Sequence, residues 1–167
     1  MKKMIMAFGM AAVMAVTPQT VMAAGKNLVA ESVENTGYAF SVNETRILIN
    51  QDASAALEKL GKAKKVFEQD SCAYQGKDRV YSYDGFEIST YPVGKKEYVS
   101  SVYIMDNTVQ TEEGIKIGSG SKELIKAYGK DYKLENDVYR YSRDGVELCF
   151  YMTNQKVDAI EYLVAVK

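Results

Sequence analysis

The chain has 167 residues, which suffices for one domain or two small repeat units. Its hydrophobic fraction of 47% and its charged fraction of 26% are ordinary for a folded globular protein and argue against wholesale disorder. The formal net charge of -1 provides no basic field of the kind that attracts nucleic acid. We therefore expect a folded protein that has no nucleic-acid partner.

The first 23 residues have the pattern of a secretory signal peptide. Two lysines precede an almost wholly apolar run over 4–16, and the small-residue pattern at 21–23 predicts cleavage after Ala23. An uncleaved membrane anchor is the alternative, but the run is short for a spanning helix and Pro18 interrupts its end. No cysteine near the cut allows lipid attachment, and no later run could span a bilayer. The sequence thus predicts a secreted mature protein.

A hairpin pattern occurs twice, over 81–91 and over 139–151. Each copy has Tyr-x-Tyr, then an Asp-Gly pair, then apolar-Glu-apolar and a further tyrosine. Asp-Gly between alternating runs is typical of a tight hairpin, because glycine adopts positive φ without steric cost. We therefore predict two antiparallel hairpins that turn at 84–85 and 144–145.

Each hairpin follows a short helical pattern and precedes another strand. Residues 53–60 place alanines and leucines on one helical face, with Asp52 as the expected N-cap and Gly61 as the stop. Residues 122–128 form the second helix, which Gly129 ends. The same order of strand, helix, hairpin and final strand in both halves indicates an internal duplication. The predicted class is α+β, with two tandem helix-plus-antiparallel-sheet units and the helices on one face of the sheet.

The duplication divides the mature chain into three parts. Residues 24–43 are expected to be a tether, with a possible edge strand at its end where Tyr38 and Phe40 alternate with smaller residues. The first repeat unit spans 44–107 and the second spans 108–167. Before its hairpin, the first unit has an extra loop of about ten residues, and this loop contains one of the two cysteines.

Period-two alternation assigns the two faces of the sheet. The apolar positions Phe86, Ile88 and Thr90, with Val146, Leu148 and Phe150 in the second unit, are expected to lie under the helices. The opposite face would carry polar and aromatic side chains and would stay uncovered, as antiparallel sheets permit. From this face we select the candidate partner-contact residues Tyr91, Tyr103, Tyr151, Glu87 and Glu147. Tyrosine suits such a surface because it offers a large contact area at a low entropy cost.

The two cysteines, Cys72 and Cys149, are the only ones in the chain. An even number in an exported protein favours a disulfide between them. Two separate thiols are the alternative, because sequence alone does not show that the two Cα atoms approach each other.

Recognisable catalytic chemistry is missing from the sequence. There is no histidine, which removes Cys-His and Ser-His-Asp hydrolases and the commonest metal ligand. Two isolated cysteines make no zinc signature, and 118–121 lacks the spacing of a phosphate-binding loop. We expect no cofactor and no metal. Glu87 and Glu147 are the minimum pair for glycoside hydrolysis, but two solvated glutamates that keep a sheet face soluble are the simpler explanation, because such glutamates are common.

The segments 71–78, 81–83, 87–92 and 111–118 resemble those of a group of uncharacterised exported proteins of clostridial-type Firmicutes. The resemblance covers roughly 44–167. Many members of that group carry a lipid-anchoring cysteine, which this chain lacks. The tandem units resemble the β-lactamase inhibitor protein fold. That second resemblance implies a concave sheet surface that grips a partner protein, without assigning the contact to any particular residue.

Three functions follow as hypotheses. The first is an exported, non-enzymatic binding module that grips a protein or a cell-envelope polymer through the open sheet face. The second is an enzyme that acts on a glycan or envelope polymer through Glu87 and Glu147, which requires the two carboxylates to lie within roughly 10 Å of each other. The third is a structural envelope protein. The oligomeric state stays open.

Overall fold

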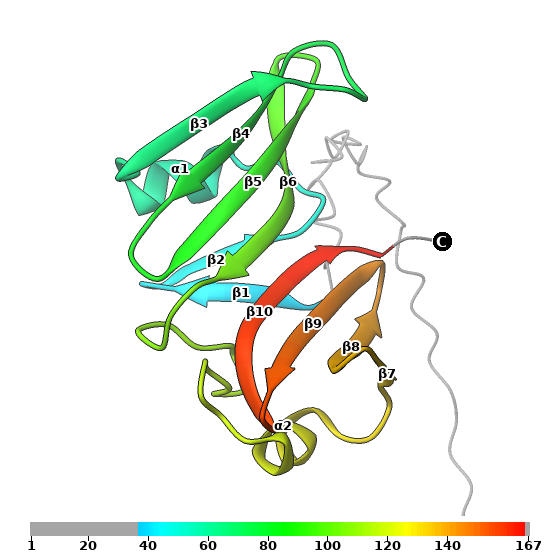
Figure 1. Cartoon of the computed structure of the whole chain (residues 1–167). Coiled ribbons are helices and arrows are strands. Elements are labelled where there is room, and N and C mark those ends of the chain that lie inside the picture. The colour runs from blue at the N-terminus through cyan, green and yellow to red at the C-terminus, as the bar shows by residue number, and fades with distance from the viewer. Residues whose placement is uncertain (1–36, 166–167) are drawn as a thin grey trace, which may run out of the picture. The chain divides into compact units, whose positions relative to one another are not determined.

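The computed structural model describes residues 37–165, so the predicted signal peptide and most of the predicted tether lie outside the described residues. The described part contains ten strands and two helices (Figure 1). Their bounds are β1 Ala39–Val42, β2 Thr45–Leu48, α1 Ser54–Leu60, β3 Lys65–Asp70, β4 Lys77–Ser82, β5 Phe86–Val93, β6 Lys96–Ile104, α2 Ser121–Tyr128, β7 Lys133–Glu135, β8 Val138–Arg143, β9 Val146–Thr153 and β10 Lys156–Val164.

Eight of the strands form one antiparallel sheet in the order β3-β4-β5-β6-β10-β9-β8-β7. The central pair is β6 with β10, so two strands that are far apart in sequence join the two ends of the sheet (Figure 1). Both predicted hairpins are confirmed: β4 pairs with β5 around Asp84-Gly85, and β8 pairs with β9 around Asp144-Gly145. Both glycines have positive φ, as such turns require.

One edge of strand β6 bonds to two different neighbours along its length. Its register with β5 shifts between Ser89 and Thr90, which marks a bulge in β6 near Ser100. Before the bulge, the free edge of β6 bonds to the segment 50–53, for example from the Asn50 N–H to the Val99 carbonyl at 2.8 Å. After the bulge, the same edge pairs with β10. The bulge therefore divides one strand between two neighbours.

The helices are short and end where the sequence predicts. Gly61 follows α1 and Gly129 follows α2, both with positive φ, and the N–H of each bonds back to the last helical turn. The N-cap of α1 is Ala53, so the prediction of Asp52 at that position is wrong by one residue. The Asp52 carboxylate still accepts the N–H of Ser54, the first helical residue, at 3.0 Å. Within residues 37–165, no helix is long and apolar enough to cross a membrane.

One face of the sheet carries the hydrophobic core. The predicted inward positions are confirmed: Phe86, Ile88, Thr90, Val146, Leu148 and Phe150 are all buried. Much of their cover comes from the β1–β2 hairpin, in which Phe40 and Ile47 are wholly buried. The Phe40 ring lies 5.1 Å from the Phe86 ring and 6.0 Å from the Tyr162 ring, centroid to centroid. The hairpin thus packs across the strands that meet at the centre of the sheet.

The predicted α+β class, with two tandem helix-plus-sheet units like those of the β-lactamase inhibitor protein, is wrong. Strands hold about 50% of the structure and helices only 12%, and eight of the ten described strands form one continuous sheet. Helices of two turns are too short to cover eight strands. No residue of α1 is fully buried, and in α2 only Leu124 is. A hairpin has taken over the covering role that the prediction gave to helices.

We predict that Phe40→Ala destabilises the protein by about 3–5 kcal/mol, because it opens a cavity between the hairpin and the sheet. Phe67→Ala is the matched control, since Phe67 is 53% exposed on β3 and its loss should cost less than about 1 kcal/mol. Urea unfolding followed by circular dichroism measures both. Equal losses would contradict the covering role of the hairpin.

We also predict that stability falls in alkali. Burial raises the pKa of Tyr141 from 10.0 to about 12, and burial also raises the pKa values of Tyr128 and Tyr162. Between pH 10 and 12 the unfolded chain loses these protons while the native protein keeps them, so the free energy of unfolding falls as pH rises through this window. Urea midpoints from pH 8 to 12 measure the effect. Tyr141→Phe should make the decline shallower, and a midpoint that is constant to pH 12 would refute the prediction.

Candidate binding surface

The side of the sheet opposite the hydrophobic core, here called the far face, holds all five predicted contact residues. The strand registers place its members in rows across the sheet. The far-face residues used below are Ser82, Glu87, Ser89, Tyr91, Tyr98, Tyr103, Arg140, Glu147, Cys149, Tyr151 and Glu161.

One row crosses six strands through the middle of the far face. The aligned residues, from β4 to β8, are Ser82, Glu87, Tyr103, Glu161, Cys149 and Arg140. The structure therefore brings Glu87 and Tyr103 together directly, and Glu147 and Tyr151 lie on either side of Cys149 along β9. Tyr91 belongs to a different part of the face, beside Tyr98.

The two predicted glutamates are not a pair. Glu87 is on β5 and Glu147 is on β9, with β6 and β10 between them. Three strand spacings and an offset of two residues place their Cα atoms roughly 16 Å apart. Carboxylate pairs in glycoside hydrolases lie roughly 5–10 Å apart. The arrangement therefore lacks the geometry that the hydrolase hypothesis requires.

In the middle of the far face, polar side chains form hydrogen bonds with one another. The Tyr151 hydroxyl donates to Glu161 Oε2 at 2.8 Å, and the Ser82 hydroxyl donates to Glu87 Oε1 at 2.7 Å. Arg140 Nη1 donates to Glu147 Oε2 at 3.1 Å. These contacts leave Tyr103, 37% exposed, as the most open of the predicted contact residues in the row.

The predicted disulfide between Cys72 and Cys149 is wrong, because the structure has both cysteines free. Cys72 is exposed in the loop after β3, and at least four strand spacings, roughly 19 Å, separate that loop from β9. Disulfides need Cα atoms within about 7 Å. The Cys149 thiol is buried beneath Arg140, whose Nη1 lies 3.2 Å from Sγ. Burial outweighs the nearby guanidinium and raises the pKa of Cys149 to about 11.

A pocket of about 500 Å³ lies at the outer end of the far face, where the β3–β4 loop (71–76) meets strands β3 to β6. The Ser71 N–H bonds to the Gly76 carbonyl at 3.0 Å and closes the loop. Gly76 has φ of +126°, and a Cβ there would lie 2.9 Å from Pro92 Cβ, so glycine lets the loop approach the sheet. The pocket is lined by Asn50, Gln69, Ser71, Ala73, Tyr74, Asp78, Arg79, Val80, Ser89, Thr90, Tyr91, Ser100 and Val164.

Two tyrosines and a carboxylate give this pocket its chemistry. The ring centroids of Tyr74 and Tyr91 lie 5.0 Å apart, with 30° between the ring planes. On its other side, the Tyr91 ring lies 6.0 Å from the Tyr98 ring. The Tyr91 hydroxyl donates to the side-chain oxygen of Asn50. Asp78 Oδ1 is inaccessible to solvent and has no hydrogen-bond partner within the described part of the chain. Buried polar atoms are nearly always paired, so this oxygen is an exception among the residues that line the pocket.

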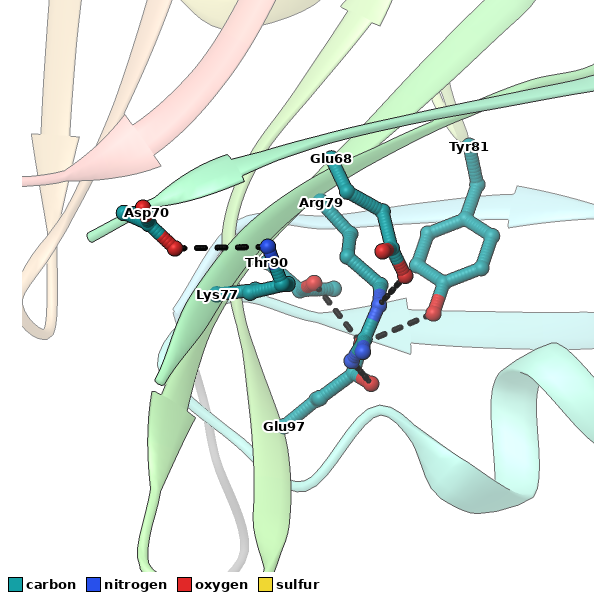
Figure 2. Close-up of polar contacts among 7 residues, drawn as sticks. All are labelled: Glu68, Asp70, Lys77, Arg79, Tyr81, Thr90 and Glu97. Atoms are coloured by element: carbon teal, nitrogen blue, oxygen red, sulfur yellow. Dashed lines mark hydrogen bonds and ion pairs between the residues drawn. The ribbon is translucent and has the colours of Figure 1, made fainter. Parts of the chain in front are cut away.

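A polar network joins side chains on the core side of the strands that line the pocket (Figure 2). The Glu97 carboxylate accepts hydrogen bonds from the Tyr81 hydroxyl at 2.8 Å and the Thr90 hydroxyl at 2.9 Å, and it pairs with Arg79. Arg79 also donates to Glu68 Oε1 at 2.5 Å (Figure 2). Burial, followed by the bond to Glu97, raises the pKa of Tyr81 to about 12. The network joins β3 to β6 and holds the strands that carry the pocket.

Sequence reasoning found Tyr91 but missed Tyr74, Asp78 and Asn50. The available signal was the extra loop of the first hairpin: β3 and β4 have six residues each around a loop at 71–76, whereas β7 and β8 meet at a turn of two residues. Loops added to a rigid scaffold often carry function. Among residues 37–165, no group of three histidines, cysteines or carboxylates is arranged to hold a metal ion.

We predict that the native protein has one reactive thiol. Cys72 is exposed and should react at once with Ellman's reagent at pH 8, whereas buried Cys149 should react only after the addition of urea. The Cys72→Ser variant should show no fast-reacting thiol. A count of zero free thiols in unfolded, unreduced protein would show a disulfide and contradict the structure.

Comparison with known proteins shows a likeness of fold alone. The solved structure of an extracellular protein containing a SCP domain, from Bacillus anthracis str. Ames, is similar to this chain with a TM-score of 0.53 and 13% sequence identity. The match covers 74% of this chain and 47% of that one, so this chain spans about half the length of the matched protein. No protein-family model matches the sequence, and no curated protein does.

Proposed function

We propose that the protein is an exported, non-enzymatic binding module that holds a protein or cell-envelope partner through its far face. The observation that carries this proposal is the pocket under the β3–β4 loop, which combines a pair of contacting tyrosine rings with an unpartnered carboxylate oxygen. Ligand sites are typically concave and largely apolar, with a few placed polar groups, and this pocket has that character.

Two further observations support export. The chain begins with a pattern typical of a signal peptide, and the protein of similar fold is described as extracellular. Membership of the exported clostridial-type group is part of the same proposal. The glycan-acting enzyme receives no support from the geometry, since Glu87 and Glu147 lie on strands that are three positions apart in the sheet.

The test compares pocket and non-pocket tyrosines. The protein, purified after export and immobilised, is exposed to culture supernatant and to cell-wall fragments, and the retained material is quantified. The double variant Tyr74→Ala, Tyr91→Ala should retain at least about ten-fold less of the specific partner, because these two aromatic side chains, which contact each other in the pocket, provide the main contact area. Tyr103→Ala is the matched control, since Tyr103 is on the far face but outside the pocket.

Folding of each variant is checked by its urea midpoint, so that loss of binding is separated from loss of structure. Recovery of the same material in equal amounts by the folded double variant and by the wild type would remove the pocket from the proposed function. Loss of binding only in Tyr103→Ala would move the contact to the middle of the far face and would likewise remove the pocket from the proposed function.

A further inference from the structure

We propose that the pocket under the β3–β4 loop binds a protonated primary amine, presented as a lysine side chain of a polypeptide partner. This inference rests on the proposed function and names the chemistry of its ligand. It depends on the charge inside the pocket, the nature of the walls and the open sheet edge beside them.

The pocket contains a negative charge, that of Asp78, which forms no ion pair with any residue in 37–165. Asp78 and Arg79 are the charged residues in the lining. The Arg79 guanidinium is already bonded to Glu68 and Glu97 on the core side of the sheet, so it does not neutralise Asp78 (Figure 2). An ammonium group in the pocket would pair with the half-buried Asp78 carboxylate through a charge-assisted hydrogen bond.

The walls suit a cation on an apolar stem. Tyr74 and Tyr91 contribute aromatic rings, and the electron-rich face of an aromatic ring attracts a positive charge. Val80 and Ala73 complete apolar walls along which methylene groups can pack. A carboxylate, aromatic rings and aliphatic walls together fit the ammonium end and the stem of lysine.

The sheet edge beside the pocket favours a polypeptide source for the amine. β3 is the outermost strand on this side of the sheet, and no strand of the described chain pairs with its outer edge. All six of its residues are exposed, including Val66 at 47% and Phe67 at 53%. An extended peptide can add to such an edge through main-chain hydrogen bonds. A strand in that position would present alternate side chains on the far face, next to Gln69 and the pocket.

The test uses small probes with the purified full-length secreted protein. Nα-acetyl-lysine methylamide should bind saturably, with amide chemical-shift changes concentrated in residues 69–80 and 89–91. Its Nε-acetyl counterpart has the same stem without the charge, and it should bind at least ten-fold more weakly. Equal affinity for the two probes would overturn the proposal.

A pair of variants isolates the role of the carboxylate. Asp78→Asn should weaken binding of the lysine probe at least ten-fold. Asp70→Asn removes the same charge from the exposed end of β3 and should change affinity less than two-fold. Asp78→Asn should also unfold at an equal or higher urea concentration, because it removes the charge from a carboxylate that has one buried oxygen without a hydrogen-bond partner among residues 37–165. Unchanged lysine binding in folded Asp78→Asn, or equal losses in both variants, would refute the inference.

Glucosamine distinguishes the source of the amine. If glucosamine binds more tightly than the lysine probe, the polypeptide source is wrong and an amino sugar takes its place. The two proposals also fail separately. No lysine binding, together with partner loss in the Tyr74→Ala, Tyr91→Ala variant, would end this inference and keep the proposed function. Undiminished partner binding in that double variant would remove the pocket from the proposed function, whatever the result with the lysine probe.

Discussion

The pairing of β6 with β10 is the constraint on which the rest of the structure depends. It joins two groups of four strands through residues 101–104 and 160–163, which are far apart in sequence. Because the register places Ile104 opposite Ile160 and Val102 opposite Tyr162, the apolar faces of both groups point to the same side. A slip of one residue would turn one of these faces toward solvent, so hydrophobic burial specifies the pairing.

The continuous sheet needs a cover that spans its centre, and the β1–β2 hairpin supplies it. Phe40 reaches rings from both groups, Phe86 on β5 and Tyr162 on β10. Tyr128 of α2 covers the β8–β9 end through contacts with Tyr141 and Phe150. At the other end, α1 buries no residue fully, and the network around Glu97 bonds the strands together. Polar bonds thus secure the part of the sheet that has the thinnest apolar cover.

The middle and the outer end of the far face differ in whether they leave space for a pocket. The middle of the far face is filled by its own hydrogen bonds, such as Tyr151 to Glu161 and Arg140 to Glu147, and its buried thiol is covered. The outer end differs because a longer hairpin folds its loop back over the sheet and encloses a space. The hydrogen bonds around Glu97 and the bond from Ser71 to Gly76 position the strands and the loop that carry Asp78 and Tyr74.

The sequence by itself determined the local features of this protein. Alternating side chains defined the inward positions of β5 and β9, Asp-Gly pairs located the two tight turns, and Gly61 and Gly129 marked the helix ends. These depend on neighbouring residues alone. The single sheet, the covering hairpin, the separation of Cys72 from Cys149 and the enclosure of Asp78 were decided by tertiary structure. Each depends on which distant strands pair and in what register, and that choice comes from burial summed over the whole fold, which no short stretch of sequence encodes.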